Sequence, residues 1–292
     1  MPLKAVKPEV VAVGKPKFLI SGESGVGKTW FALDFPKPYY IDTEGGAVRQ
    51  QYREKLAAVG GVYFGKDQGS QDFKSVIDEI TELATTKHDY KTLVIDSFTH
   101  LYDLAASIAE ETVGNEFGRD KKEANRPARQ LIRWLENVDM TVILITHAKD
   151  KWVRQGKETV SAGTTFDGYQ KLKYLLDLWM EGKKLGRQRS LTVRKTRIES
   201  LPEDKELPME YQAFAALYGK EVIERASTTL AMATTEQVAR IKELVGTLRL
   251  EEEAQKWMEK ANVDEWVEMT EAQLAKCIEF CNKKLAAVVG TK

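Results

Sequence analysis

Residues 17–35 hold the feature that most restricts how this chain can fold. An apolar run at 17–21 precedes a glycine-rich segment, and a short helical stretch follows it until the prolines at positions 36 and 38. The segment matches the pattern G-x-x-x-x-G-K-[ST] in full, with Gly22, Glu23, Ser24, Gly25, Val26, Gly27, Lys28 and Thr29. Glycines there let the backbone N–H groups turn around an anion, and the helix directs its positive end at the same point. The sequence therefore predicts a phosphate-binding loop between a buried strand and a helix.

Further positions extend this loop into a site for ATP and Mg²⁺. Lys28 is placed for the β- and γ-phosphates, Thr29 for Mg²⁺, and Trp30 completes the expected nucleotide contacts. Asp96 ends the apolar run 92–95, which reads as a buried strand. Because ligands bind beyond the carboxyl ends of strands in open parallel sheets, an aspartate there can hold the water shell of Mg²⁺. We therefore expect Thr29 and Asp96 to form the metal site.

The segment YYIDTEGG, residues 39–46, supplies a candidate for the hydrolytic step. It reads as a strand followed by a turn that carries an acidic pair. ATP hydrolysis requires a group that orients the attacking water or accepts its proton near the γ-phosphate. Asp96 is followed by Ser97 and not by a second acid, so this carboxylate must come from elsewhere. Glu44, just past the end of the strand, is the residue that we expect in this role.

Alternating strands and helices predict an α/β fold for the larger part of the chain. Helical spacing marks residues 72–87, 100–112 and 124–138, and strands are expected at 91–98, 140–147, 176–184 and 189–197. Continuous apolar strands of this kind are typical of a mostly parallel sheet flanked by helices. Residues 114–125 are expected to form a polar hinge between two of the helices.

The character of the sequence changes after about residue 225. Residues 226–233 are small and polar and read as a linker, and residues 234–292 show helical periodicity only. Thr234 or Thr235 is the candidate cap of the first helix in that region. We therefore predict a core over residues 1–225, followed by a small bundle of three or four helices.

Composition and charge exclude several classes of protein. The 292 residues carry 44 Lys and Arg against 44 Asp and Glu, so the chain is not a polycation that coats nucleic acid unselectively. Residues 148–200 carry 13 basic and 6 acidic side chains, which predicts one basic face. No run approaches the roughly 18 apolar residues of a membrane span, and the first residues lack the apolar core of a signal peptide, so we expect a cytoplasmic protein without a membrane segment. Cys277 and Cys281 lie four residues apart, which is typical of helix packing and not of a disulfide framework.

Four segments together resemble the RecA superfamily of recombination ATPases: GESGVGKT (22–29), YIDTEGG (40–46), LVIDSFTH (93–100) and VILITHAKD (142–150). The resemblance covers residues 15–225 and implies a RecA-like fold in which Glu44 is the catalytic glutamate and Asp96 the metal ligand. It also implies that His147 senses the γ-phosphate, at the place where bacterial RecA has glutamine. With this histidine the chain is more similar to small phage-encoded RecA-like ATPases that are linked to single-strand annealing and often grouped only under an AAA domain. A buried, hydrogen-bonded histidine at a strand end is the alternative.

Lys195 and Arg197 extend the resemblance to the contact between subunits. Both lie in the predicted strand 189–197, where side chains alternate with period two, so the two cations are expected on one face. RecA-like and ring-helicase ATPases carry a similar pair, which enters the ATP site of the neighbouring subunit and stabilises charge on the transferring phosphoryl group. The resemblance thus implies a homo-oligomer, either a filament or a ring, with ATP at its interfaces. A solvated basic edge strand is the alternative.

Two basic segments are candidates for binding single-stranded DNA. The segment after His147 contains Lys149, Lys151, Trp152, Arg154 and Lys157, and in RecA-like proteins it is a mobile loop that holds DNA. The other segment, residues 114–129, contains Phe117, Arg119, Lys121, Lys122 and Arg126. Cations neutralise phosphates, and an aromatic ring stacks on a base. Solvated loops, or loops that touch only neighbouring subunits, are the alternatives.

The leading hypothesis is therefore an ATPase that binds single-stranded DNA and supports homologous recombination, DNA repair or strand annealing. A RecA-type helicase or a helicase loader is one alternative. Another is a nucleotide-switched adaptor whose C-terminal bundle recruits a single-strand-binding, replication or repair protein. A small-molecule kinase is disfavoured, because the sequence has no recognisable Arg-rich lid.

Overall fold

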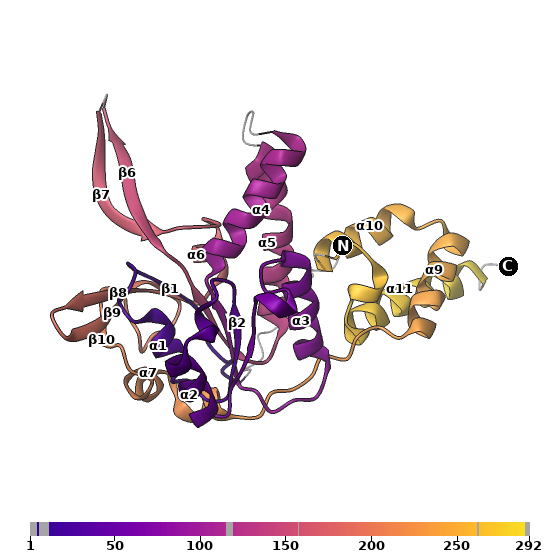
Figure 1. Cartoon of the computed structure of the whole chain (residues 1–292). Helices are drawn as coiled ribbons and strands as arrows, with labels where there is room; N and C mark the ends of the chain where they lie inside the picture. The colour runs from indigo at the N-terminus through magenta and orange to yellow at the C-terminus, as the bar shows by residue number, and fades with distance from the viewer. Residues whose placement is uncertain (1–4, 6–11, 115–118, 157, 262, 290–292) are drawn as a thin grey trace. The chain divides into compact units, whose positions relative to one another are not determined.

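The computed structural model describes residues 5, 12–114, 119–156, 158–261 and 263–289. Its centre is an eight-stranded sheet with the strand order β10-β9-β8-β1-β5-β4-β2-β3 (Figure 1). The strands are β1 (Lys17–Ser21), β2 (Pro38–Asp42), β3 (Val62–Phe64), β4 (Thr92–Asp96), β5 (Thr141–Ile145), β8 (Leu178–Leu185), β9 (Gln188–Thr196) and β10 (Glu206–Pro208). All neighbours from β3 to β8 are parallel, and β9 and β10 add antiparallel pairs at one edge. The predicted α/β fold with a mostly parallel sheet is confirmed.

The carboxyl ends of four neighbouring strands lie level with one another. Ile145 of β5 is paired with Ile20 of β1 and with Asp96 of β4, and Asp96 is paired with Asp42 of β2. The four strands are equal in length and almost entirely buried, because the inner strands of a parallel sheet are covered on both faces. The loops after these four strands therefore meet at one edge of the sheet.

Helices connect the strands of the first part of the chain and make up the last part. They are α1 (Lys28–Ala32), α2 (Gln50–Ala58), α3 (Phe73–Thr85), α4 (Phe98–Val113), α5 (Arg119–Asn137), α6 (Leu172–Leu175), α7 (Tyr211–Tyr218), α8 (Lys220–Glu224), α9 (Thr235–Leu248), α10 (Glu251–Ala261) and α11 (Glu271–Val289). Capping side chains fix two of the starts. Ser97 Oγ accepts from the backbone N–H of His100 at 3.1 Å, and Thr234 forms a capping box with Gln237. The cap of α9 is thus the first of the two threonines that the sequence offered.

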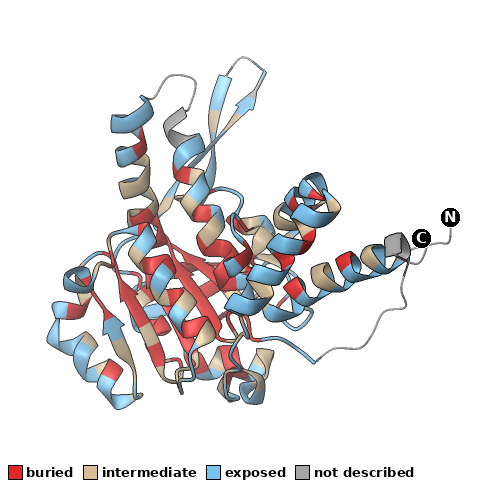
Figure 2. Cartoon of the chain, turned by 90° about the vertical axis from the view of Figure 1, so that its right-hand side faces the viewer, coloured by how far each residue is buried: buried red, intermediate tan, exposed pale blue. Residues whose placement is uncertain are grey.

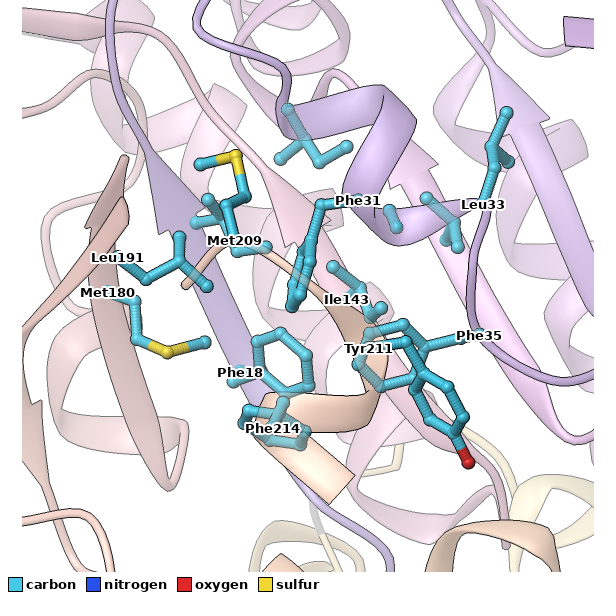
Figure 3. Close-up of a cluster of buried hydrophobic side chains, with 14 of the residues drawn as sticks. Phe18, Phe31, Leu33, Phe35, Ile143, Met180, Leu191, Met209, Tyr211 and Phe214 are labelled. Atoms are coloured by element: carbon cyan, nitrogen blue, oxygen red, sulfur yellow. The ribbon is translucent and has the colours of Figure 1, made fainter. Parts of the chain in front are cut away.

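An aromatic cluster seals one face of the sheet beside α1 (Figure 3). The ring of Phe18 on β1 lies 4.9 Å from that of Phe214 on α7 and 5.9 Å from that of Phe35. Phe31 of α1 and Tyr211 of α7 complete the cluster, and none of the five is more than 7% exposed. Burying one such side chain contributes about 1.5–3 kcal/mol. The cluster therefore holds α1, and with it the glycine-rich loop, firmly against β1. Figure 2 shows the buried residues gathered in the sheet and on the helix faces next to it.

The segment after β5 is a β-hairpin and not the loop that the sequence predicted. β6 (Ala148–Gln155) pairs antiparallel with β7 (Glu158–Phe166), and the hairpin stands away from the main sheet (Figure 1). A half-buried strand is recognised from alternating apolar residues, but most described residues of this hairpin are exposed. The sequence of the hairpin therefore has no apolar alternation that identifies its two strands.

The predicted polar hinge at 114–125 is also corrected. α5 begins at Arg119, so this helix includes Arg119, Lys121, Lys122 and Arg126. Lys, Arg and Glu are good helix formers, and residues 119–123 contain no apolar residue on which a prediction from helical periodicity relies. Phe117 and Lys157, which were named as candidate DNA contacts, lie outside the described residues.

The chain divides into two compact units. One contains Met1–Val76, Asp89–Ala128 and Asp139–Ser227, and the other contains Ile77–His88, Arg129–Val138 and Thr228–Lys292. In the second unit α9, α10 and α11 contribute to a small core that includes Ile241, Leu244, Trp266, Leu274 and Cys281. The domain limits predicted from the sequence stay predictions. Among the described helices, none is both long and apolar enough to cross a membrane.

Candidate active site

A cavity of about 530 Å³ opens at the carboxyl edge of the sheet. Its wall includes part of the glycine-rich loop and the start of α1, the ends of β2, β4 and β5, residues that follow β2 and β5, and Arg189 with Met209. Nine residues that the sequence placed in the site of one subunit line this cavity: Ser24, Gly25, Gly27, Lys28, Thr29, Trp30, Glu44, Asp96 and His147. The level ends of the strands thus bring together side chains that are up to 123 positions apart in the sequence.

The glycine-rich loop has the backbone that an anion cradle requires. Gly22, Gly25 and Gly27 have φ angles of 154°, 76° and 105°, which favour glycine. A Cβ built on Gly22 would lie 2.9 Å from the carbonyl oxygen of Gly182 and 3.2 Å from Cγ1 of Val26. Val26 is 4% exposed and belongs to the core cluster, so it anchors the loop while the residues around it turn.

Lys28 lies folded over this loop. Its Nζ donates hydrogen bonds to the carbonyl oxygens of Gly22 at 2.6 Å and Glu23 at 2.9 Å. Burial lowers the pKa of Lys28, while the carboxylates of Asp96 and Glu44 act in the opposite direction. A buried ammonium that has only carbonyl partners gains from a negative ligand, and phosphate oxygens provide one.

Thr29 and Asp96 meet where the metal site was predicted. Thr29 Oγ1 donates to Asp96 Oδ2 at 2.5 Å, and the hydroxyl of Tyr40 donates to the same oxygen at 3.2 Å. Burial raises the pKa of Asp96 to about 6; Glu44 and Asp42 also raise it, and the two hydroxyl groups lower it. Carboxylate and hydroxyl oxygens are ligands that Mg²⁺ prefers. The buried carboxylate would also be relieved of its electrostatic cost by a divalent cation, so these residues fit Mg²⁺.

Glu44 is held at the mouth of the cavity by groups from two other strands. Ser97, which follows β4, donates its hydroxyl to Glu44 Oε1, and His147 Nε2 lies 2.8 Å from the same oxygen. The turn that presents Glu44 is fixed by Asp42, whose carboxylate accepts from the backbone N–H groups of Gly46 at 2.9 Å and Ala47 at 2.6 Å. Glu44 keeps 40% of its side chain exposed, so water reaches it. The arrangement suits a carboxylate that orients a water molecule.

His147 links this carboxylate to the base of the β6–β7 hairpin. Its backbone N–H donates to Thr99 Oγ1 at 3.0 Å, and Thr99 Oγ1 donates to the carbonyl oxygen of Asp167 at 2.8 Å. The N–H of Asp167 returns a hydrogen bond to the carbonyl oxygen of His147 at 2.9 Å. β6 starts at the next residue, Ala148, and β7 ends just before Asp167. Both ends of the hairpin are therefore tied to the residue that contacts Glu44.

A second link runs from the hairpin to the strand that carries the glycine-rich loop. Phe166, the last residue of β7, packs edge-on against Trp179 with ring centroids 5.2 Å apart. Trp179 Nε1 donates to Ser21 Oγ at 2.8 Å, and Ser21 directly precedes Gly22. The end of the hairpin thus contacts β1 through one aromatic side chain.

Glu181 of β8 adds a polar contact to this link. Thr164 of the hairpin donates its hydroxyl to Glu181 Oε1, and Arg194 of β9 donates to Glu181 Oε2 from Nε at 2.9 Å and Nη2 at 2.5 Å. Burial acts to raise the pKa of Glu181, but the hydrogen bonds from Thr164 and Arg194 outweigh it and the pKa is lowered. Glu181 is 8% exposed, whereas the side chain of Arg194 is 34% exposed, so only the carboxylate of this ion pair is buried.

Lys195 and Arg197 do not line the cavity of their own subunit. β9 ends at Thr196, so Arg197 lies one residue beyond the strand. Lys195 Nζ donates to the carbonyl oxygen of Leu176, and Arg197 Nη2 donates to that of Tyr174. Burial lowers the pKa of Lys195, and the neighbouring Arg197 lowers it as well. The two cations thus lie next to one another and outside the cavity.

Several residues of the site were not found in the sequence. Tyr40 and Ser97 act on Asp96 and Glu44 through hydrogen bonds that join different strands. Tyr52 and Arg189 line the cavity and belong to no motif. Tyr40 and Ser97 lie within the recognised segments 40–46 and 93–100, so their positions in these motifs offered a signal. No local pattern marks Arg189, because its place depends on how β9 is aligned with β8.

A family model described as an AAA domain matches residues 14–198. No curated protein matches the chain significantly. Among solved structures, the RadB recombinase has a TM-score of 0.42 and 17% identity, with 65% of this chain and 84% of that chain covered. A prototypical ATPase from the type III secretion system of pathogenic bacteria has a TM-score of 0.40 and 11% identity, with 90% of this chain and 81% of that chain covered.

Proposed function

The chain belongs to the AAA domain family and is a P-loop ATPase, and from this premise we propose that it binds single-stranded DNA and supports homologous recombination or strand annealing. In this proposal ATP is hydrolysed at the interfaces of a homo-oligomer. The nucleotide cavity and the β6–β7 hairpin are its two functional parts, and the hydrogen bonds around His147 connect them.

The chemistry of the cavity supports hydrolysis. The loop N–H groups and Lys28 hold the phosphates, and Glu44 orients the attacking water and accepts its proton. Ser97 and His147 hold Glu44 in position, so little reorganisation is needed when the reaction occurs. Mg²⁺, held by Thr29 and Asp96, would supply the positive charge that neutralises the phosphate oxygens.

One contact carries the proposal that hydrolysis depends on nucleic acid. His147 Nε2 lies 2.8 Å from Glu44, and the hairpin begins at the following residue. On the hairpin Trp152 is 60% exposed, and Lys151 and Arg154 next to it are exposed as well. An exposed indole stacks on bases without regard to sequence, and cations neutralise phosphates. A strand of DNA on the hairpin would therefore act on the residue that contacts Glu44.

ATP turnover with and without a single-stranded oligonucleotide tests this proposal. We expect DNA to raise the turnover of the wild-type protein, and Lys28→Ala to abolish turnover in both conditions. Trp152→Ala should lose the stimulation and keep the basal rate. Tyr63→Ala, which removes an exposed aromatic from the edge strand β3, is the matched control and should be stimulated normally. A wild-type rate that is indifferent to DNA refutes the proposal.

The proposed role of the subunit interface has its own test. Lys195 and Arg197 lie together outside the cavity of their own subunit, as expected for cations that enter a neighbour's site. Arg197→Ala should remove turnover and leave ATP binding by the isolated subunit intact. Mixing Arg197→Ala with Lys28→Ala subunits should then restore part of the activity, because the first supplies an intact loop and the second an intact arginine. A normal rate of Arg197→Ala alone, or no recovery on mixing, contradicts the role.

A further inference from the structure

Arg189 lies in the wall of the nucleotide cavity without belonging to any motif. It is the second residue of β9 and lines the cavity together with Met209. A Cβ built on Gly27 would lie 2.9 Å from Cδ and 3.1 Å from Nε of Arg189. The side chain therefore packs directly on the bare backbone of the phosphate-binding loop, and any residue larger than glycine at position 27 would displace it.

The guanidinium of Arg189 is not neutralised by any side chain in the part of the chain that the structure describes. Among the described residues none forms an ion pair or a side-chain hydrogen bond with it, and the side chain is exposed. Across the β8–β9 ladder Arg189 is paired with Lys184, so two like charges lie opposite one another. Such a pair is destabilising, and an anion beside it would relieve the repulsion. Gly182, two residues before Lys184 on the same face, lies against Val26 of the loop, because a Cβ there would be 3.3 Å from Val26 Cγ1. The face of the β8–β9 ladder that carries Lys184 and Arg189 therefore adjoins the phosphate-binding loop.

The strand order indicates which end of the nucleotide this cation faces. β8 and β9 lie on one side of β1, and β5, β4 and β2 lie on the other. The γ-phosphate belongs to the second side, because Asp96 and Glu44 follow β4 and β2 there. A phosphate chain that crosses the loop after β1 therefore directs its other end toward β9. We propose that Arg189 binds the α-phosphate of the nucleotide in its own subunit.

This inference rests on nucleotide binding at the loop, and it does not depend on DNA. The α-phosphate keeps its bonds during hydrolysis of the terminal phosphate, so Arg189 binds ground state and transition state equally. Removing such an interaction raises KM and leaves kcat unchanged. ADP carries the same α-phosphate, so its affinity should fall by the same factor as that of ATP.

The test compares dissociation constants of ATP and ADP for the wild type, Arg189→Gln and Arg187→Gln, by calorimetry in the absence of DNA. Arg187 lies in the turn between β8 and β9, two residues before Arg189, and it does not line the cavity. Arg187→Gln therefore removes the same charge close to Arg189 but outside the cavity. Arg189→Gln should weaken both nucleotides about tenfold, as expected for one charged hydrogen bond. Arg187→Gln should stay within about twofold. The KM for ATP should rise together with the dissociation constant in Arg189→Gln, and Arg187→Gln, which does not line the cavity, should keep the wild-type KM and basal rate.

Several results would overturn the assignment. They are an unchanged affinity for ADP, a loss for ATP that far exceeds the loss for ADP, or an equal loss in Arg187→Gln. Equal thermal unfolding midpoints of the wild type and Arg189→Gln show that the fold is intact, and Arg189→Lys should retain part of the affinity if the contact is ionic. If the wild-type protein itself fails to bind ATP, the ATPase premise is wrong. If it binds and Arg189→Gln binds equally, only the role of Arg189 is wrong.

Discussion

Replacing Asp96 by asparagine should stabilise the metal-free protein at neutral pH while it removes ATP hydrolysis. Asp96 is 7% exposed and accepts hydrogen bonds from Thr29 and Tyr40 on one oxygen. Asn has the same shape and keeps an oxygen that accepts both bonds. The substitution therefore removes the negative charge from a buried position and changes little else.

The magnitude follows from the pKa of this carboxyl group. Its folded-state pKa is raised to about 6, by burial first and by Glu44 and Asp42 next, against 3.8 for the solvent-exposed carboxyl group of an unfolded chain. A raised pKa means that the folded state holds its proton more tightly than the unfolded state. The stability that comes from this proton is complete below pH 3.8 and is lost as the pH rises through 6. At about 1.4 kcal/mol per pH unit, ionised Asp96 costs the folded state about 3 kcal/mol above this window.

Urea unfolding with a chelator present, at pH 7.5 and at pH 5, measures this difference. Asp96→Asn should raise the free energy of unfolding by about 3 kcal/mol at pH 7.5 and by about half of that at pH 5. Asp204→Asn removes a carboxylate whose side chain is 87% exposed, and it serves as the matched control with no expected change. With Mg²⁺ and ATP, Asp96→Asn should lower turnover about a hundredfold or more. A variant that is less stable than the wild type at pH 7.5, or a gain that does not depend on pH, would refute this reasoning.

Three further substitutions have expected outcomes. Phe214→Ala opens a cavity beside Phe18 and should lower the free energy of unfolding by about 3–5 kcal/mol in urea. Glu181→Gln weakens the ion pair with Arg194, so it should reduce stimulation by DNA while ATP affinity stays at the wild-type value; an unchanged stimulation would mean that the link through β8 is not used. Leu274→Ala, at a fully buried position in the second unit, should lower the unfolding free energy of that unit by about 2–5 kcal/mol, measured by hydrogen exchange of α9 and α11; unaltered exchange would contradict the core assignment.

The part of the site that the sequence predicted depends on local patterns. The glycine spacing from Gly22 to Gly27 determines the backbone of the loop, and the apolar run before Asp96 determines that this carboxylate ends a buried strand. Both patterns reflect short-range constraints, namely backbone dihedrals and the burial of a strand on two faces. The parallel sheet was predictable for the same reason, since its inner strands contain apolar runs such as 18–20, 93–95 and 142–145.

The remaining part depends on register between distant segments, which short patterns do not encode. The exposed hairpin had no apolar alternation, and Arg189 reaches the cavity only because β9 is paired with β8 at a particular offset. Ser97 illustrates the intermediate case. Its place after Asp96 was evident, but its hydrogen bond to Glu44 requires that β2 and β4 end level with one another.

The hydrogen bonds around Glu44 determine what coupling between the two functional parts requires. Glu44 contacts His147, and Thr99 joins His147 to Asp167, so both ends of the hairpin are fixed to one small network. If ATP shifts Glu44 and thereby changes the affinity of the hairpin for DNA by some factor, then DNA must change the affinity for ATP by the same factor, because binding free energies around a closed cycle are reciprocal. This equality applies to the two binding affinities and does not apply to the rate of hydrolysis. A stimulated rate without any change in ATP affinity would therefore mean that DNA acts on the orientation of Glu44 in the transition state and not on the binding of the nucleotide.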